Sequence, residues 1–125
     1  MTNLATDILS ELIETKREIL GQLRNLGIQQ REAIETGVTD HLFRVLAAKQ
    51  RLLGDLRQVE QRLTPYREQD PDKRAWRSSE DREHCAVKSE QCEQLLADVI
   101  RQERESEQAM IQRRDDAAKQ LRAVH

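Results

Sequence analysis

Residues 30–56 read QREAIETGVTDHLFRVLAAKQRLLGDL, and this stretch decides the fold. Gly37 follows an amphipathic run, and glycine is the residue that most easily adopts the left-handed conformation closing a helix. Thr39 or Asp40 then offers a side-chain oxygen suited to cap a new helix. Leucines follow at the three- and four-residue spacings of one helical face. The stretch therefore predicts a helical hairpin with a short turn.

The same periodicity extends outward on both sides of the turn. It predicts a first helix over about residues 3–36, with Thr2 or Asn3 as its N-cap, and a second helix over about residues 40–64, ended by Pro65. The apolar face of the first helix is expected to comprise Leu4, Ile8, Leu9, Leu12, Ile13, Ile19, Leu20, Leu23, Leu26, Ala33 and Ile34. The face of the second is expected to comprise Leu42, Phe43, Leu46, Leu53, Leu56, Val59 and Leu63.

A third helix is predicted over about residues 79–123, after a charged, proline-containing surface loop at residues 65–78. Ser78 and Asp81 have the spacing of a capping box at its start. Its apolar face is expected to comprise Cys85, Cys92, Leu95, Leu96, Val99, Ile100, Met110, Ala117, Leu121 and Val124, interrupted by Glu103 and Ser106. At ~1.5 Å per residue this helix is ~65–70 Å long against ~38 Å for the second. Its distal half therefore needs a further partner: a second copy, a fold-back or another protein.

Composition agrees with long helices. Hydrophobic residues make up 37% of the chain, charged residues 35%, and the aromatic residues are only Phe43, Tyr66 and Trp76. We expect an all-α, single-domain protein over residues 1–125, folded as an elongated antiparallel three-helix bundle, coiled-coil-like, with a long third helix. The narrow apolar faces leave a homodimer open as well. Trp76 is expected to pack over one end of the bundle, with a binding hot spot as the alternative.

Several classes of function have little support in the sequence. The net charge of −2 comes from well-mixed acids and bases, so no segment is suited to follow a nucleic-acid backbone. No apolar run approaches the ~20 residues of a membrane-spanning helix, and no secretory signal is evident, so a cytoplasmic location is expected. Cys85 and Cys92 lie ~10.5 Å apart along one helix, too far to bridge, and are expected to be buried reduced thiols.

No pattern in the sequence indicates catalysis or metal binding. Asp81 and His84 have the spacing of half a carboxylate–histidine metal pair, but Glu-x-x-His occurs nowhere in the chain. His84, Cys85 and Cys92 match no common zinc spacing, and no glycine-rich phosphate loop is present. We therefore expect a non-enzyme without cofactor or metal.

A thin apolar strip on the distal third helix is the candidate binding site. It consists of Ala109, Met110, Ile111, Ala117, Leu121 and Val124. Two interpretations remain open: the strip is bundle or dimer core, or it is a groove in which an adaptable methionine and small alanines accept an incoming amphipathic helix.

Residues 30–56 resemble the flagellar export chaperones of the FlgN type. The matching positions are Ala33, Ile34, Gly37, Asp40, Leu42, Leu46, Lys49, Gln50, Leu52, Leu53 and Leu56. The resemblance implies a cytoplasmic chaperone that binds helical termini of hook–filament junction proteins, prevents their premature assembly and delivers them to the type III export apparatus. It also implies that clients bind the distal third helix, at Met110, Ile111, Ala117, Leu121 and Val124. The alternative is a structural coiled-coil scaffold or secretion-apparatus component without a client groove.

Overall fold

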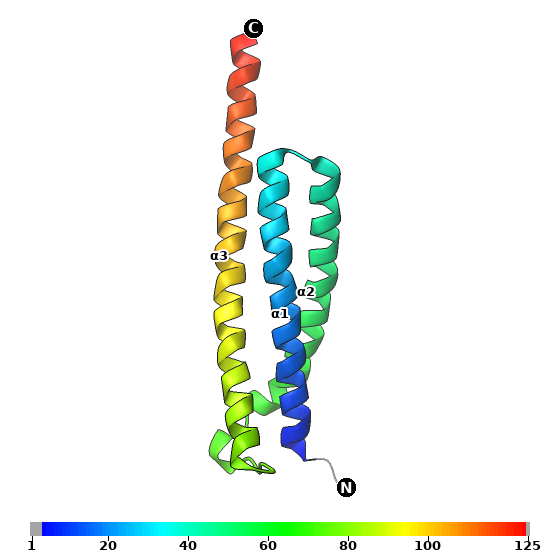
Figure 1. Ribbon diagram of the computed structural model, residues 1–125, viewed down its shortest axis with the longest axis vertical. Helices are drawn as coiled ribbons and strands as arrows, with labels where there is room; N and C mark the ends of the chain where they lie inside the picture. Colours follow the sequence, from blue (N-terminus) through cyan, green and yellow to red (C-terminus); the bar gives the residue numbers. More distant parts are fainter. Residues whose placement is uncertain (1–3, 125) are drawn as a thin grey trace.

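The computed structural model describes residues 4–124, which form three long α-helices and one short 3₁₀ turn. The helices are α1 (Ala5–Thr36), α2 (Thr39–Arg67) and α3 (Ser79–Val124), with the turn η1 at Pro71–Lys73. In Figure 1, α1 and α2 form a hairpin, while α3 runs beside α1 in the same direction and projects beyond the hairpin turn. The predicted all-α three-helix bundle is confirmed. The predicted N-caps Thr2 and Asn3 lie outside the described residues.

The hairpin turn is built around Gly37, as predicted. Gly37 has φ = +72°, and its N–H donates to the carbonyl of Ala33 at 2.9 Å. The N–H of Val38 donates to the same carbonyl at 3.2 Å, which completes the helix stop. The prediction that Thr39 or Asp40 caps α2 is wrong. Val38 occupies the cap position and no side chain caps the helix, because Thr39 is already its first helical residue.

The predicted end of α2 is also wrong by three residues, since the helix continues through Pro65 to Arg67. Proline in the last turn removes only one backbone hydrogen bond, so the helix can accommodate it there. The loop that follows then supplies hydrogen-bond donors to a backbone carbonyl at the end of the helix. The carbonyl of Tyr66 accepts hydrogen bonds from the N–H of Gln69 at 3.3 Å and from Nη2 of Arg74 at 2.6 Å.

The start of α3 and the start of α1 are held by short polar contacts. Oγ of Ser78 accepts from the N–H of Asp81 at 3.1 Å, as the predicted cap requires. At the other helix, Oδ2 of Asp7 accepts from the N–H of Leu4 at 2.8 Å. The same carboxylate pairs with Arg77 at 2.8 Å, so the loop before α3 is tied to the first turn of α1.

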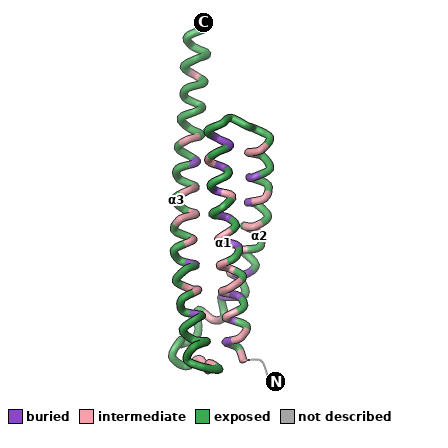
Figure 2. Tube along the Cα trace, viewed as in Figure 1, coloured by how far each residue is buried: buried purple, intermediate pink, exposed green. Residues whose placement is uncertain are grey.

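The core lies along α1, which packs against both other helices (Figure 2). Among the described residues, α2 and α3 have no Cα atoms within 8 Å of each other. The buried cluster consists of Leu9, Leu12, Ile19, Leu20, Leu23, Val59, Leu63, Cys85 and Cys92. Trp76 and Tyr66 pack against its lower end, so the predicted packing role of Trp76 is confirmed. The bundle is therefore open along the side where α2 faces α3.

The buried face of α2 differs from the predicted face. Val45 and Lys49 are buried, whereas Phe43, Leu46 and Leu53 are exposed. The prediction grouped apolar residues and passed over Lys49, whose long methylene stem can lie in an apolar interface while its ammonium finds a partner. The face that meets α1 therefore repeats every seven residues from Val45 through Leu52 and Val59, and Leu46 and Leu53 fall outside it.

The buried face of α3 is displaced in the same way. Ser106, predicted to interrupt the apolar face, is only 3% exposed and lies within it. Leu96 and Ile100, predicted as core, are exposed. A heptad line through Cys85, Cys92 and Ser106 faces α1 because the two helices run side by side as in a coiled coil.

Candidate interaction surface

The last three turns of α3 extend beyond the rest of the bundle. Nη1 of Arg113 donates to the carbonyl of Glu35 at 3.1 Å, near the end of α1. Residues 114–124 continue past this point for ~16 Å at 1.5 Å per residue. Figure 1 shows them projecting above the hairpin turn, and Figure 2 shows them almost entirely exposed. This segment is called the α3 overhang below.

The predicted client-binding residues lie on or next to the overhang, and all are exposed. Met110 is 47% exposed, Leu121 64% and Val124 80%. These residues and Ala117 are separated by seven, four and three positions, so they share one helical face. Ile111 is also exposed but lies about 100° around the helix from Met110. The structure therefore brings together the predicted residues except Ile111.

The same face continues toward the bundle through Leu96 and Ile100, both exposed. We call the apolar residues of this face together the α3 strip; it comprises Leu96, Ile100, Met110, Ala117, Leu121 and Val124. Sequence reasoning assigned the proximal part to the core. The seven-residue spacing of Cys85, Cys92 and Ser106 is the signal that could have separated the buried face from the strip.

A buried polar cluster lies beside the proximal strip and connects all three helices. Lys49 of α2 is 6% exposed, and its Nζ donates to Oε1 of Gln30 in α1 at 2.6 Å. The same ammonium forms an ion pair with Glu103 of α3. Burial lowers the pKa of Lys49. Lys49 belongs to the stretch of residues 30–56 considered above, but the sequence pattern predicts neither its burial nor these hydrogen-bond and ion-pair partners.

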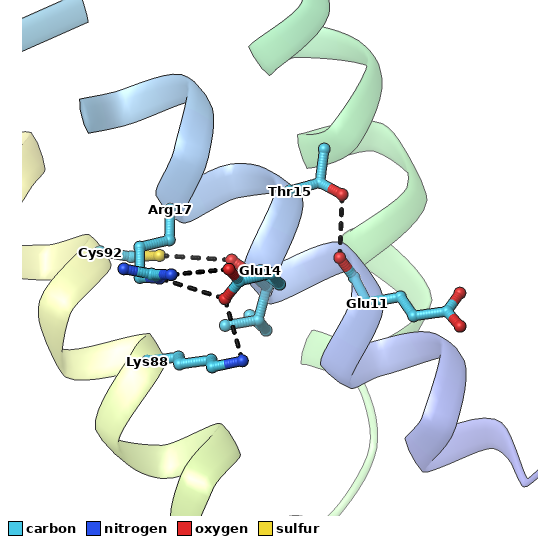
Figure 3. Close-up of polar contacts among 7 residues, drawn as sticks. Glu11, Glu14, Thr15, Arg17, Lys88 and Cys92 are labelled. Carbon is cyan, nitrogen blue, oxygen red and sulfur yellow. Dashed lines mark hydrogen bonds and ion pairs between the residues drawn. The ribbon is translucent and has the colours of Figure 1, made fainter. Parts of the chain in front are cut away.

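Ion pairs fix α3 against α1 lower in the bundle (Figure 3). The carboxylate of Glu14 contacts Arg17 at 2.6 Å and Lys88 of α3 at 3.0 Å. Hydrogen bonds from Arg17 and then from Lys88 lower the pKa of Glu14 to about 2. Because Lys88 belongs to α3, this cluster helps hold the helices in their parallel register.

The cysteines are free and buried, as predicted. Sγ of Cys92 lies 3.6 Å from the carbonyl oxygen of Ile13 (Figure 3). Burial raises the pKa of the Cys92 thiol, so little of the reactive thiolate forms near neutral pH. Both residues act as packing groups between α1 and α3.

A pocket of about 360 Å³ lies at the loop end of the bundle, between α1, α2 and α3. Trp76, Tyr66 and Arg74 contribute to its wall. Nε of Arg74 is buried without a hydrogen-bond partner, while its Nη2 donates to the carbonyl of Tyr66. Within residues 4–124, no group of three or more histidine, cysteine, aspartate or glutamate side chains is placed to hold a metal ion.

Comparison of the chain with family models, curated proteins and solved structures gives no match. None of the described helices combines the length and apolar character needed to cross a bilayer. The features of the chain that bear on its function are the exposed α3 strip and the helical hairpin of residues 30–56.

Proposed function

We propose that this chain is a non-enzymatic export chaperone, which binds the helical termini of flagellar hook–filament junction proteins in the cytoplasm and prevents their premature assembly. The observation that carries the proposal is the distal α3 strip, which is apolar, exposed and located on a helix end without a neighbour in the described fold. A contiguous apolar surface bordered by polar residues is typical of an interaction site. The resemblance to FlgN-type chaperones suggests the kind of client.

The chemistry of the strip suits an amphipathic helix as client. Met110 has a flexible, polarizable side chain that adapts to differently shaped partners. Ala117 lets another helix approach closely, while Leu121 and Val124 supply apolar area. A client helix would place its residues i, i+3, i+4 and i+7 on this surface. The apolar face that the client uses for its own assembly would then be covered by the chaperone. Binding of this kind needs neither cofactor nor catalysis.

Calorimetric titration tests the proposal directly. The ligands are synthetic C-terminal helical segments of the hook–filament junction proteins from the same organism. We expect dissociation constants of ~1–10 µM for the unsubstituted chain and at least ~10-fold weaker binding for Met110→Glu. Gln108→Glu is the matched control, since it makes the same charge change ~160° around the helix. Absence of binding by the unsubstituted chain at ~0.5 mM peptide would overturn the proposal.

A structural coiled-coil component of a secretion apparatus is the second candidate. The α3 overhang favours it, because a helix that extends beyond its own bundle is suited to join another subunit. This function requires a stable homo-oligomer that client segments do not dissociate. Sedimentation equilibrium with and without the same peptides separates the two candidates.

A further inference from the structure

The open side of the bundle has apolar walls on both helices that border it. Lys49 of α2 and Glu103 of α3 form an ion pair across this side. Leu46 and Leu53 lie one turn before and one turn after Lys49, and both are exposed. On α3, Ile100 lies one turn before Glu103, with Leu96 a further turn away. The open side between α2 and α3 therefore has exposed leucines on its α2 edge and a leucine and an isoleucine on its α3 edge; we call this open side the α2–α3 groove.

One edge of this groove is the start of the α3 strip, whose helical face continues through three charged residues into the overhang. Its positions recur every three or four residues, on average every 3.5, as Leu96, Ile100, Glu103, Glu107, Met110, Arg114, Ala117, Leu121 and Val124. That repeat is typical of helices that supercoil around a partner. Since α1 occupies the neighbouring face of α3, a second seam of this kind calls for a second helix.

We infer that a second copy of this chain supplies that helix: the α3 strips of two copies pair antiparallel around Met110, and each overhang lies in the α2–α3 groove of the other copy. With Met110 on the two-fold axis, Leu96 lies level with Val124 of the second copy, and Ile100 lies within one residue of the level of its Leu121. Glu103 faces Ala117 of the second copy, a side chain small enough to leave the ion pair with Lys49 in place. Apolar residues thus meet apolar residues at Met110 and at both ends of the paired segment.

Charge complementarity selects the antiparallel direction. In this register Glu107 lies within one residue of the level of Arg114 of the second copy, on the paired face, and the two-fold axis generates the same pair a second time. A parallel, in-register pairing would place Glu107 against Glu107 and Arg114 against Arg114, which repels at both positions. The self-complementary order of an acid before Met110 and a base after it therefore fits one direction of pairing.

The length of the overhang fits the same register. Pairing around Met110 places residues 114–124 of one copy beside residues 96–106 of the other. That is the part of α3 which borders the groove at the level of Leu46, Lys49 and Leu53. The two bundles lie toward opposite ends of the paired helices and overlap in height only over residues 107–113, because α1 of each copy ends near its own Arg113. Each copy then gains the helix that its open side lacks.

This dimer covers the residues to which the proposed function assigns client binding. The dimer itself does not depend on the proposed function. The effect of the dimer on client binding does rest on the proposed function. A client helix would have to displace the second copy from Met110, Ala117 and Leu121. The free chaperone would therefore hold its client surface covered, and client binding would convert the dimer to a one-to-one complex.

Site-specific disulfides test the register. Ile100→Cys and Leu121→Cys are made as separate proteins carrying tags of different size, mixed, and oxidised mildly. We expect the mixed species to cross-link at least ~10-fold more than either protein alone. The unsubstituted chain is the control for Cys85 and Cys92, which are buried. Cross-linking of Ile100→Cys mainly to itself would show a parallel pair and overturn the inference, as would absence of any cross-link.

Charge reversal provides an independent test by sedimentation equilibrium, with the 14.6 kDa monomer mass as reference. Glu107→Arg and Arg114→Glu are each expected to raise the dimer dissociation constant about 10-fold, and the double variant is expected to restore it. Circular dichroism confirms that each variant folds. A monomer at ~0.5 mM for the unsubstituted chain would overturn the inference.

The client peptides then separate this inference from the proposed function. A cross-linkable dimer that no client peptide dissociates supports the pairing and contradicts the chaperone. A monomeric chain that binds the peptides through Met110 supports the chaperone and contradicts the pairing. Peptide-induced loss of the Ile100–Leu121 cross-link would support both.

Discussion

Nζ of Lys49 lies 2.6 Å from Oε1 of Gln30 between α1 and α2, and both side chains are buried. The ammonium also pairs with Glu103, so one polar cluster touches every helix. A buried polar group with few available partners favours the single register that satisfies it. The α1–α2 register therefore depends on this contact as well as on apolar packing.

Removing one member of this pair should destabilise the protein more than removing both. Lys49→Met leaves the amide of Gln30 buried without its donor, so we expect a loss of about 1–3 kcal/mol in the free energy of unfolding. Lys49→Met combined with Gln30→Leu should recover most of that loss, because neither polar group remains. Urea unfolding of both single variants and the double variant measures the coupling. Simple additivity of the two losses would contradict this account.

Glu14 should make stability depend on pH in the acid range. Its pKa is lowered from 4.5 to about 2 by Arg17 and Lys88, so the ionised form stabilises the fold above pH 4.5. This contribution is lost as the pH falls from 4.5 toward 2. We expect Glu14→Gln to lower the free energy of unfolding by about 0.5–1 kcal/mol at neutral pH.

Urea unfolding across this pH range, comparing the unsubstituted chain with Glu14→Gln, checks the prediction. The difference between the two should shrink to zero at the acid end. Glu90→Gln, which alters an exposed carboxylate on α3, is the control and should show no such trend. If the difference in the free energy of unfolding were the same at every pH, the stabilising role assigned to ionised Glu14 would be wrong.

Alanine should have opposite effects at two of the glycines. Gly37 has φ = +72°, where an alanine Cβ is strained, so Gly37→Ala should cost about 1–2 kcal/mol. Gly54 lies inside α2, and an added Cβ there meets nothing within 4 Å. Gly54→Ala should therefore stabilise the protein by up to about 1 kcal/mol through helix propensity. Thermal unfolding of the two variants should shift in opposite directions, and a shared sign would contradict the assigned turn.

Adjacent residues in α2 test which of its faces is buried. Val45 is 3% exposed and Leu46 37% exposed. Val45→Ala should cost about 1–3 kcal/mol through lost burial and cavity formation. Leu46→Ala should cost less than about 1 kcal/mol, although it removes more carbon atoms than Val45→Ala does, because much of its side chain already contacts water. Denaturant unfolding at low protein concentration, where a dimer is dissociated, gives the comparison.

Much of the helical layout could be predicted from local signals. Gly37 stopped α1 as expected, and Ser78 capped α3 as expected. Pro65 misled the prediction because its effect depends on how close it lies to a helix end. That distance is decided by contacts from the loop, such as the one from Arg74 to the carbonyl of Tyr66, which the sequence pattern does not contain.

The candidate site was predicted less completely than the helices. Met110, Ala117, Leu121 and Val124 were identified from their spacing, and the structure places them together on an exposed face. Periodicity could not show that Ile111 points elsewhere or that the strip continues through Leu96 and Ile100. Two apolar faces on one helix overlap in a spacing pattern, and only the position of α1 shows which face is buried.

By itself, the sequence determined the helical class, the two turns and the great length of α3, because these depend on propensities and caps acting over a few residues. The tertiary structure alone decided which faces of α2 and α3 are buried and that these two helices both pack against α1 without approaching each other. It also decided that Lys49 is buried, through its contacts with Gln30 and Glu103. Such features depend on groups far apart in the chain, whose free energies are set only when the helices pack together.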